Sequence, residues 1–188
     1  LYDRKSGCGL SSEVRKVNGI LLQQCGVNDE GSTLMMKITK KKLDDMYRSY
    51  CASYITIGGE TCALIASEEE GYPCYMYSGR DFEKRETVWE KGGGCMSIIP
   101  IPNKNNEFLA IVDFYLKVSP SKAKVVWGKY DSETGWEIKD VLYLPYLHRF
   151  DIYDVDGVNY FVGATIADDK DFKDDWSRSG SIYYGVLP

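Results

Sequence analysis

The chain has 188 residues and a formal net charge of −5, and it contains 1 histidine, 6 cysteines and 15 tyrosines. This length can bury a hydrophobic core, and a hydrophobic fraction of 44% excludes wholesale disorder. Acidic residues outnumber basic ones, whereas a nucleic-acid-binding protein needs a concentration of basic residues. No apolar run reaches the roughly 18 residues of a membrane-spanning helix. We therefore expect one globular domain over 1–188, with neither nucleic acid nor membrane as a partner.

The cysteines leave two interpretations open. An even number of cysteines in a small secreted protein indicates a disulfide framework. Here the chain is long enough to fold without disulfides, and four cysteines lie in or beside apolar, strand-like runs. Since a buried cysteine behaves as a small hydrophobic residue, we favour free thiols and a cytoplasmic location.

A plan of strand, tight turn, strand, polar loop and strand recurs along the chain. The pairs Asn18-Gly19, Gly58-Gly59 and Asp156-Gly157 are typical of two-residue hairpin turns, whose central residues need positive φ. The longer turn 103–106 takes the corresponding place in another repeat. Intervals of roughly 40 to 50 residues, with four short strands per repeat, are typical of propeller blades.

The repeat divides the chain into units at about 10–50, 51–94, 95–147 and 148–188. The expected strands are 13–17, 20–25, 33–38 and 40–48; 52–57, 61–66, 73–77 and 82–89; 96–101, 108–112, 123–127 and 136–144; and 150–155, 160–166 and 181–186. We therefore predict an all-β, β-propeller-like fold of about four antiparallel blades, with a sandwich or barrel as the alternative.

The last unit lacks a fourth strand, which leaves the predicted ring incomplete. Either residues 1–9 supply that strand, or this chain is part of a longer one or pairs with another chain. Since an open sheet edge invites pairing, self-association that completes the ring is one expectation.

In a propeller, the loop that follows the second strand of each blade lies on the same face as the start of the first strand. This places the polar loops 28–30, 68–70, 113–115 and 168–176 together. They form an acidic, aromatic face suited to a small polar ligand or a protein partner, although each loop by itself reads as solvated surface. The candidate ligand-binding residues are Glu69, Tyr115, Asp168, Asp169, Asp171, Trp176 and Arg178.

The strand starts suggest a metal site. Counting back eight residues from the turns, at Gly59 in one unit and Asp156 in another, gives Cys51, Cys95 and His148. Two thiolates and an imidazole are a candidate set of ligands for zinc, with water in the fourth position. The alternative is ordinary packing where the strands converge. No other cofactor is indicated, so a divalent metal is the one candidate.

His148 and Arg149 are the candidate catalytic residues. Histidine titrates near neutral pH and acts as an acid or a base, and arginine holds an anionic group through two hydrogen bonds. An acid from the loop 168–176 would orient the imidazole. The chain contains no G-x-S-x-G, P-loop or H-E-x-x-H motif, so no serine hydrolase, P-loop NTPase or zincin is indicated.

The runs His148-Arg149-Phe150-Asp151, Asp154-Val155-Asp156-Gly157 and Tyr160 to Ala164 resemble a blade of the FG-GAP/VCBS-type propellers. They are also similar to the propeller part of aldos-2-ulose dehydratase-like proteins. The resemblance implies a larger ring, of seven or a similar number of blades, and sugar chemistry. Two functions follow as hypotheses: a binding or interaction propeller for a small polar ligand or partner, and a carbohydrate-active lyase or isomerase that uses His148 as acid and base.

Overall fold

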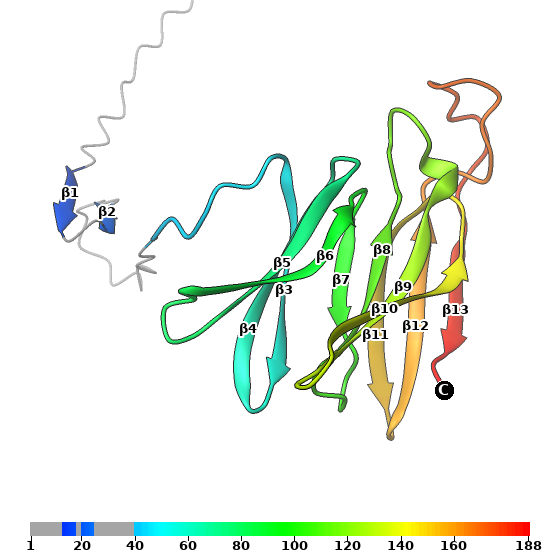
Figure 1. Cartoon of the computed structure of the whole chain (residues 1–188). Coiled ribbons are helices and arrows are strands. Elements are labelled where there is room, and N and C mark those ends of the chain that lie inside the picture. Colours follow the sequence, from blue (N-terminus) through cyan, green and yellow to red (C-terminus); the bar gives the residue numbers. More distant parts are fainter. Residues whose placement is uncertain (1–12, 18–19, 25–39) are drawn as a thin grey trace, which may run out of the picture. The chain divides into compact units, whose positions relative to one another are not determined.

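The computed structural model describes residues 13–17, 20–24 and 40–188 (Figure 1). They belong to two compact units, 1–44 and 45–188, and each is described by itself. In the first unit, β1 (Glu13–Val17) pairs antiparallel with β2 (Ile20–Gln24), as predicted. The turn 18–19, the loop 28–30, the strand predicted at 33–38 and residues 1–9 lie outside the described residues. The strand predicted at 40–48 is wrong, because residues 41–46 are irregular.

The second unit contains three antiparallel sheets, in which the strands follow one another in chain order. Sheet 1 is β3 (Ser49–Ile57), β4 (Glu60–Ser67), β5 (Tyr72–Ser78) and β6 (Lys84–Gly92). Sheet 2 is β7 (Ser97–Pro100), β8 (Glu107–Val112), β9 (Lys124–Asp131) and β10 (Gly135–Tyr143). Sheet 3 is β11 (Leu147–Val155), β12 (Val158–Thr165) and β13 (Ile182–Val186). The predicted all-β class is confirmed.

The tight turns adopt the predicted conformation. Gly58 and Gly59 have φ of 58° and 83°, and Asp156 and Gly157 have φ of 53° and 81°. Both pairs lie in the left-handed region that two-residue hairpin turns require. Equivalent turn positions are therefore Gly58 with Asp156, and Gly59 with Gly157.

The strands β7, β8 and β9 of sheet 2 bury side chains on both faces, because alternate residues point to opposite sides and each side packs against another sheet, whereas β10 is largely exposed. Phe108, on the face toward sheet 1, packs between the rings of Trp89 and Trp136, with centroids at 6.3 and 5.5 Å. Leu109, on the opposite face, belongs to the core shared with sheet 3. Sheet 2 therefore lies between two hydrophobic cores, one shared with sheet 1 and the other shared with sheet 3.

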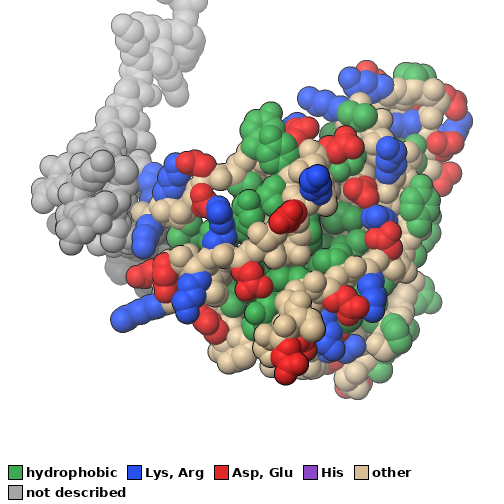
Figure 2. Space-filling view, in the orientation of Figure 1, with side chains coloured by type: hydrophobic (Ala, Val, Ile, Leu, Met, Phe, Trp, Pro, Cys, Tyr) green, Lys and Arg blue, Asp and Glu red, His purple; other side chains and the backbone are tan. Residues whose placement is uncertain are grey.

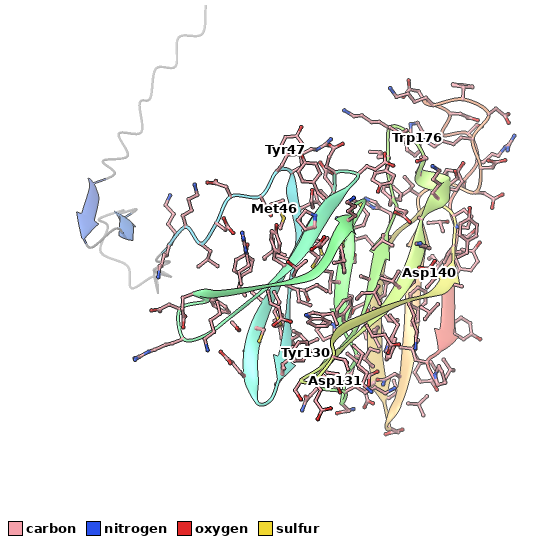
Figure 3. All side chains as sticks on the ribbon, viewed as in Figure 1. Met46, Tyr47, Tyr130, Asp131, Asp140 and Trp176 are labelled. Atoms are coloured by element: carbon pink, nitrogen blue, oxygen red, sulfur yellow. The ribbon has the colours of Figure 1, made fainter. Side chains whose placement is uncertain are left out.

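The first strands of the three sheets contact one another in turn, β3 with β7 and β7 with β11 (Figure 1). Figure 3 shows which residues share an end of the sheets: Tyr47 and Trp176 lie at one end, and Tyr130 and Asp131 lie at the other. The only helical turn in the described part of the chain is η1 (Pro120–Lys122). None of the described residues forms a helix long and apolar enough to cross a membrane.

Candidate functional site

A cavity of about 230 Å³ lies where the sheets meet, at the end where the first strands begin. Sheets 1 and 3 contribute Tyr50 and His148 to its wall, and the segments before β7 and after β4 and β8 contribute the rest together with Arg48. The lining residues are Arg48, Tyr50, Glu68, Glu69, Met96, Phe114, Tyr115, Leu116, Lys117, Val118 and His148. Three predicted residues, Glu69, Tyr115 and His148, are therefore brought together.

A β-bulge directs Tyr50 and His148 into this cavity. The pairing register shifts between Ser49 and Cys51 in sheet 1, and between Leu147 and Arg149 in sheet 3. Tyr50 and His148 are the extra residues at these two shifts, so they occupy the same place in their sheets. A bulge re-aims the side chain of the unpaired residue, which explains how both reach the cavity.

The three glycines 92–94 hold the lining loops in place between sheets 1 and 2. The amide of Gly94 donates to the carbonyl of Glu68 at 3.1 Å, and the amide of Phe114 donates to the carbonyl of Gly94 at 3.2 Å. Gly93 has a φ of 112°, and a Cβ atom there would meet the carbonyl oxygen of Glu69. Only glycine fits this close approach of two backbones.

Arg48 closes one side of the cavity through two carboxylates. Its guanidinium donates to Glu68 Oε1 at 2.5 Å and to Glu69 Oε2 at 2.6 Å. The buried hydroxyl of Ser67 donates to the carbonyl of Tyr47 at 2.9 Å, and the amide of Glu68 donates to the carbonyl of Arg48 at 3.1 Å. These bonds fix the turn that carries Arg48, so the cavity presents both a cation and two anions.

His148 packs its ring against Phe114, with ring centroids 5.0 Å apart. Partial burial and then the nearby charge of Arg149 lower the pKa of the imidazole below its ordinary value. None of the residues 40–188 hydrogen-bonds to the imidazole, so the predicted orienting acid is not seen there. The neutral ring, with one nitrogen able to accept a proton, is the form present at neutral pH.

Arg149 lies beside the cavity rather than in its wall. Its guanidinium donates to the carbonyl of Met96 and, at 3.1 Å, to the hydroxyl of Tyr50. The sequence suggested that Arg149 holds an anionic substrate. In the structure it holds Tyr50 in place and adds positive charge near His148.

The hydroxyl of Tyr115 lies 3.5 Å from Asp113 Oδ1. Burial, followed by the negative charge of Asp113, raises the pKa of Tyr115. Lys124 Nζ contacts the other carboxylate oxygen of Asp113 at 3.3 Å, which ties the base of this loop to β9. Tyr115 therefore remains a neutral hydroxyl, able to donate one hydrogen bond and to accept others.

The predicted metal set does not form. No three His, Cys, Asp or Glu side chains lie close enough to hold a metal ion among the described residues. The prediction treated Gly59 and Asp156 as equivalent turn positions and counted back from each. In the structure the residue equivalent to Gly59 is Gly157, one position later. His148 therefore corresponds to Tyr50, while Cys51 and Cys95 lie in the core between sheets 1 and 2 and hydrogen-bond to each other.

Charged side chains of the acidic loop between β12 and β13 pair with other residues of the same loop. Arg178 donates to Asp169 at 2.9 Å and to Asp171 at 2.7 Å. Asp175 is buried and accepts hydrogen bonds from Ser177 and from the amide of Asp171, which lowers its pKa to about 2.

The remaining predicted residues of this loop are exposed. Asp168 lies on the surface, and Lys170 Nζ lies over the ring of Trp176. The loop thus lies next to the cavity wall without lining it. Its acids stabilise the loop, and the acidic binding face inferred from the sequence remains a hypothesis.

Arg48 was not predicted as a cavity residue, and Tyr50, which the repeat places at a strand start on the predicted binding face, was not among the candidate binding residues. Tyr50 falls two residues before the strand predicted at 52–57, and its equivalence with His148 depends on the bulge. Counting from equivalent turn residues, from Gly59 to Tyr50 and from Gly157 to His148, would have found it. The sequence around Arg48 contains no motif that marks it as a cavity residue. Its partners Glu68 and Glu69 are distant in sequence and follow the strand β4.

Neither protein-family models nor curated proteins show a match to this chain. Function is therefore inferred from the residues of the cavity and the surfaces around it.

Proposed function

We propose that this chain is a binding protein of the β-propeller type, and that the cavity beside His148 holds a small polar ligand. The single observation that carries the proposal is the convergence of Tyr50, Tyr115 and His148, from separate sheets and loops, on one cavity. Convergent polar groups set among aromatic rings are typical of ligand sites. A volume of about 230 Å³ suits a ligand the size of a monosaccharide or smaller.

The propeller assignment is supported by repetition. Sheets 1 and 2 have four strands in chain order, sheet 3 has three, and their first strands lie next to one another. Consecutive blades of a propeller also place their first strands side by side, which supports the proposed assignment. The number of blades and the closure of the ring belong to the proposal, as does the resemblance to FG-GAP/VCBS-type propellers.

The binding proposal is tested by ligand-observed NMR with a panel of neutral monosaccharides on the full chain. We expect one or more to bind, and Tyr115→Phe and His148→Leu to weaken that binding. Tyr153→Phe is the matched control, because Tyr153 is an exposed tyrosine of β11 that does not line the cavity. Absence of binding, or equal loss in the control, contradicts the proposal.

A second candidate is a carbohydrate-active lyase or isomerase with His148 as acid and base. The observation that favours it is the neutral imidazole in the cavity wall, since a general base must be unprotonated to accept a proton. Such an enzyme removes a C–H proton next to a carbonyl or carboxylate. Deuterium uptake from D₂O into ketoses or uronates tests this. Uptake that survives His148→Leu contradicts the role of His148.

We also propose that a second copy of the chain covers the outer face of sheet 3. In sheet 3, Phe161 pairs with Gly185 on the buried face, so Tyr184 and its alternate neighbours point outward. Arg149 and Asp151 lie on this outward face near the start of β11, and the rest of the face carries exposed apolar side chains. Hydrophobic side chains gather along this side in Figure 2. The exposed apolar side chains are Tyr153, Val155, Val158, Ile182, Tyr184 and Val186. Exposed apolar patches of this kind mark interaction surfaces.

Sedimentation velocity over a range of concentrations tests this association. We expect the wild-type chain to associate and Tyr184→Lys to be monomeric. Tyr143→Lys is the control, because Tyr143 is an exposed tyrosine of another sheet. A wild-type chain that is monomeric throughout contradicts the proposal.

The proposed location is the cytoplasm, on the ground that Cys51, Cys62, Cys74 and Cys95 are free thiols.

A further inference from the structure

A second depression, of about 280 Å³, lies beside the loop 168–178 and is lined by three lysines. Lys117 comes from the loop after β8, and Lys170 and Lys173 come from the loop after β12. None of the residues that line this depression is acidic. Such a concentration of positive charge is unexpected in a chain of net charge −5.

The acids of the neighbouring loop do not neutralise these lysines. Asp169 and Asp171 are paired with Arg178, and Asp175 accepts hydrogen bonds from Ser177 and from the backbone. Among residues 40–188, no ion pair joins Lys117, Lys170 or Lys173 to a carboxylate. The Lys170 ammonium lies over the ring of Trp176, 2.9 Å from its centroid, and donates to the carbonyl of Lys173 at 3.3 Å. Like charges that line one depression repel one another, and an anion placed near them reduces that repulsion.

The rest of the lining suits the remainder of an anionic molecule. Ser119 precedes the turn η1 without capping it, so its hydroxyl is available as a donor. Phe172 is 67% exposed and lines the same depression. An exposed aromatic ring offers a surface on which the carbon skeleton of a small ligand can stack.

We propose that this depression binds the anionic group, a carboxylate, phosphate or sulfate, of a small ligand. The depression shares Leu116, Lys117 and Val118 with the cavity beside His148. A ligand of the proposed function that extends past Lys117 then places an acidic group among the lysines. That extension, which makes the ligand an acidic monosaccharide, rests on the proposed function. The anion site itself does not.

Titration of the full chain with three probes, followed by NMR or calorimetry, tests the proposal. Inorganic phosphate probes the lysine depression alone, glucose probes the cavity alone, and glucuronate probes both. We expect phosphate to bind weakly and glucuronate to bind more tightly than either of the other two. The affinity for phosphate should fall as salt is added, because salt screens exposed charges.

The variants Lys117→Gln and Lys173→Gln should each weaken phosphate binding about threefold to fivefold, and together about tenfold or more. Lys84→Gln is the control, because Lys84 is an exposed lysine of β6 that does not line the depression. Far-ultraviolet circular dichroism confirms that each variant is folded.

Phosphate that does not bind, or that binds equally to all variants, overturns the anion site. Phosphate that binds while glucose and glucuronate show no contact with the cavity contradicts only the proposed function. The two proposals therefore fail separately.

Discussion

The ring of His148 lies on the ring of Phe114, with the two planes inclined at 49°. This contact joins sheet 3 to the loop after β8, at the cavity wall. It places the only histidine of the chain in a partly apolar environment, where the charged form of the imidazole is disfavoured.

The lowered pKa of His148 predicts that stability decreases as the pH falls below about 6.5. In that range the unfolded chain binds a proton that the folded chain does not, so protonation favours unfolding. Above about pH 6.5 both states are neutral and the effect is absent. Urea unfolding between about pH 7.5 and 5.5 should show this slope in the wild type and not in His148→Gln. Parallel pH profiles of the two proteins contradict the prediction.

Gly128 and Gly185 are strand glycines with opposite surroundings. A Cβ atom at Gly128 would enter the ring of Phe108, whereas a Cβ atom at Gly185 meets nothing within 4 Å. We expect Gly128→Ala to destabilise the fold by about 1–3 kcal/mol through overpacking. Gly185→Ala should be neutral or stabilising by up to about 1 kcal/mol. Chemical denaturation measures both, and equal effects contradict the close contact of Gly128 with the ring of Phe108.

Gly93 and Gly59 both have positive φ, but only Gly93 faces another backbone. Gly59→Ala should cost about 1–2 kcal/mol, the penalty for a left-handed conformation. Gly93→Ala should cost clearly more, because its Cβ atom would collide with the carbonyl oxygen of Glu69. It should also disturb the amide resonances of Glu68 and Glu69 in NMR spectra. A Gly93→Ala variant as stable as Gly59→Ala would contradict this close approach.

Cys74 and Cys95 should be unreactive in the folded protein. Burial raises the pKa of Cys74, and the hydrogen bond with Cys51 together with burial raises that of Cys95. Since the thiolate is the reactive form, iodoacetamide should label these residues only after unfolding. Peptide mapping by mass spectrometry locates the label. Labelling of Cys74 in the native protein at the rate seen in urea contradicts its burial.

Asp175 should hold the loop between β12 and β13 together. Its pKa of about 2 shows that its hydrogen bonds favour the ionised form, so they persist above about pH 4 and are lost as the pH falls toward 2. Asp175→Asn should increase proteolysis within 168–178 with little change in the melting temperature. Asp174→Asn is the control, because Asp174 is exposed. Equal proteolysis of the two variants contradicts this role.

The sequence by itself determined the strands of residues 49–186 and their turns. Alternation of apolar residues and paired turn residues such as Gly58-Gly59 are local signals, because each depends only on backbone conformation and on which side of a strand is buried. It also identified His148, Tyr115 and Glu69 as neighbours, since the repeat fixes which loops share an end of the sheets.

Tertiary structure alone decided which side chains face the cavity. The bulges at Tyr50 and His148 shift the register by one residue, and this shift separates His148 from Cys51 and Cys95. The tertiary structure also decided which charged side chains form ion pairs with one another. Ion pairs such as those of Arg178 join residues according to distance in space, and no spacing in the sequence predicts which acids remain free and which lysines share a depression.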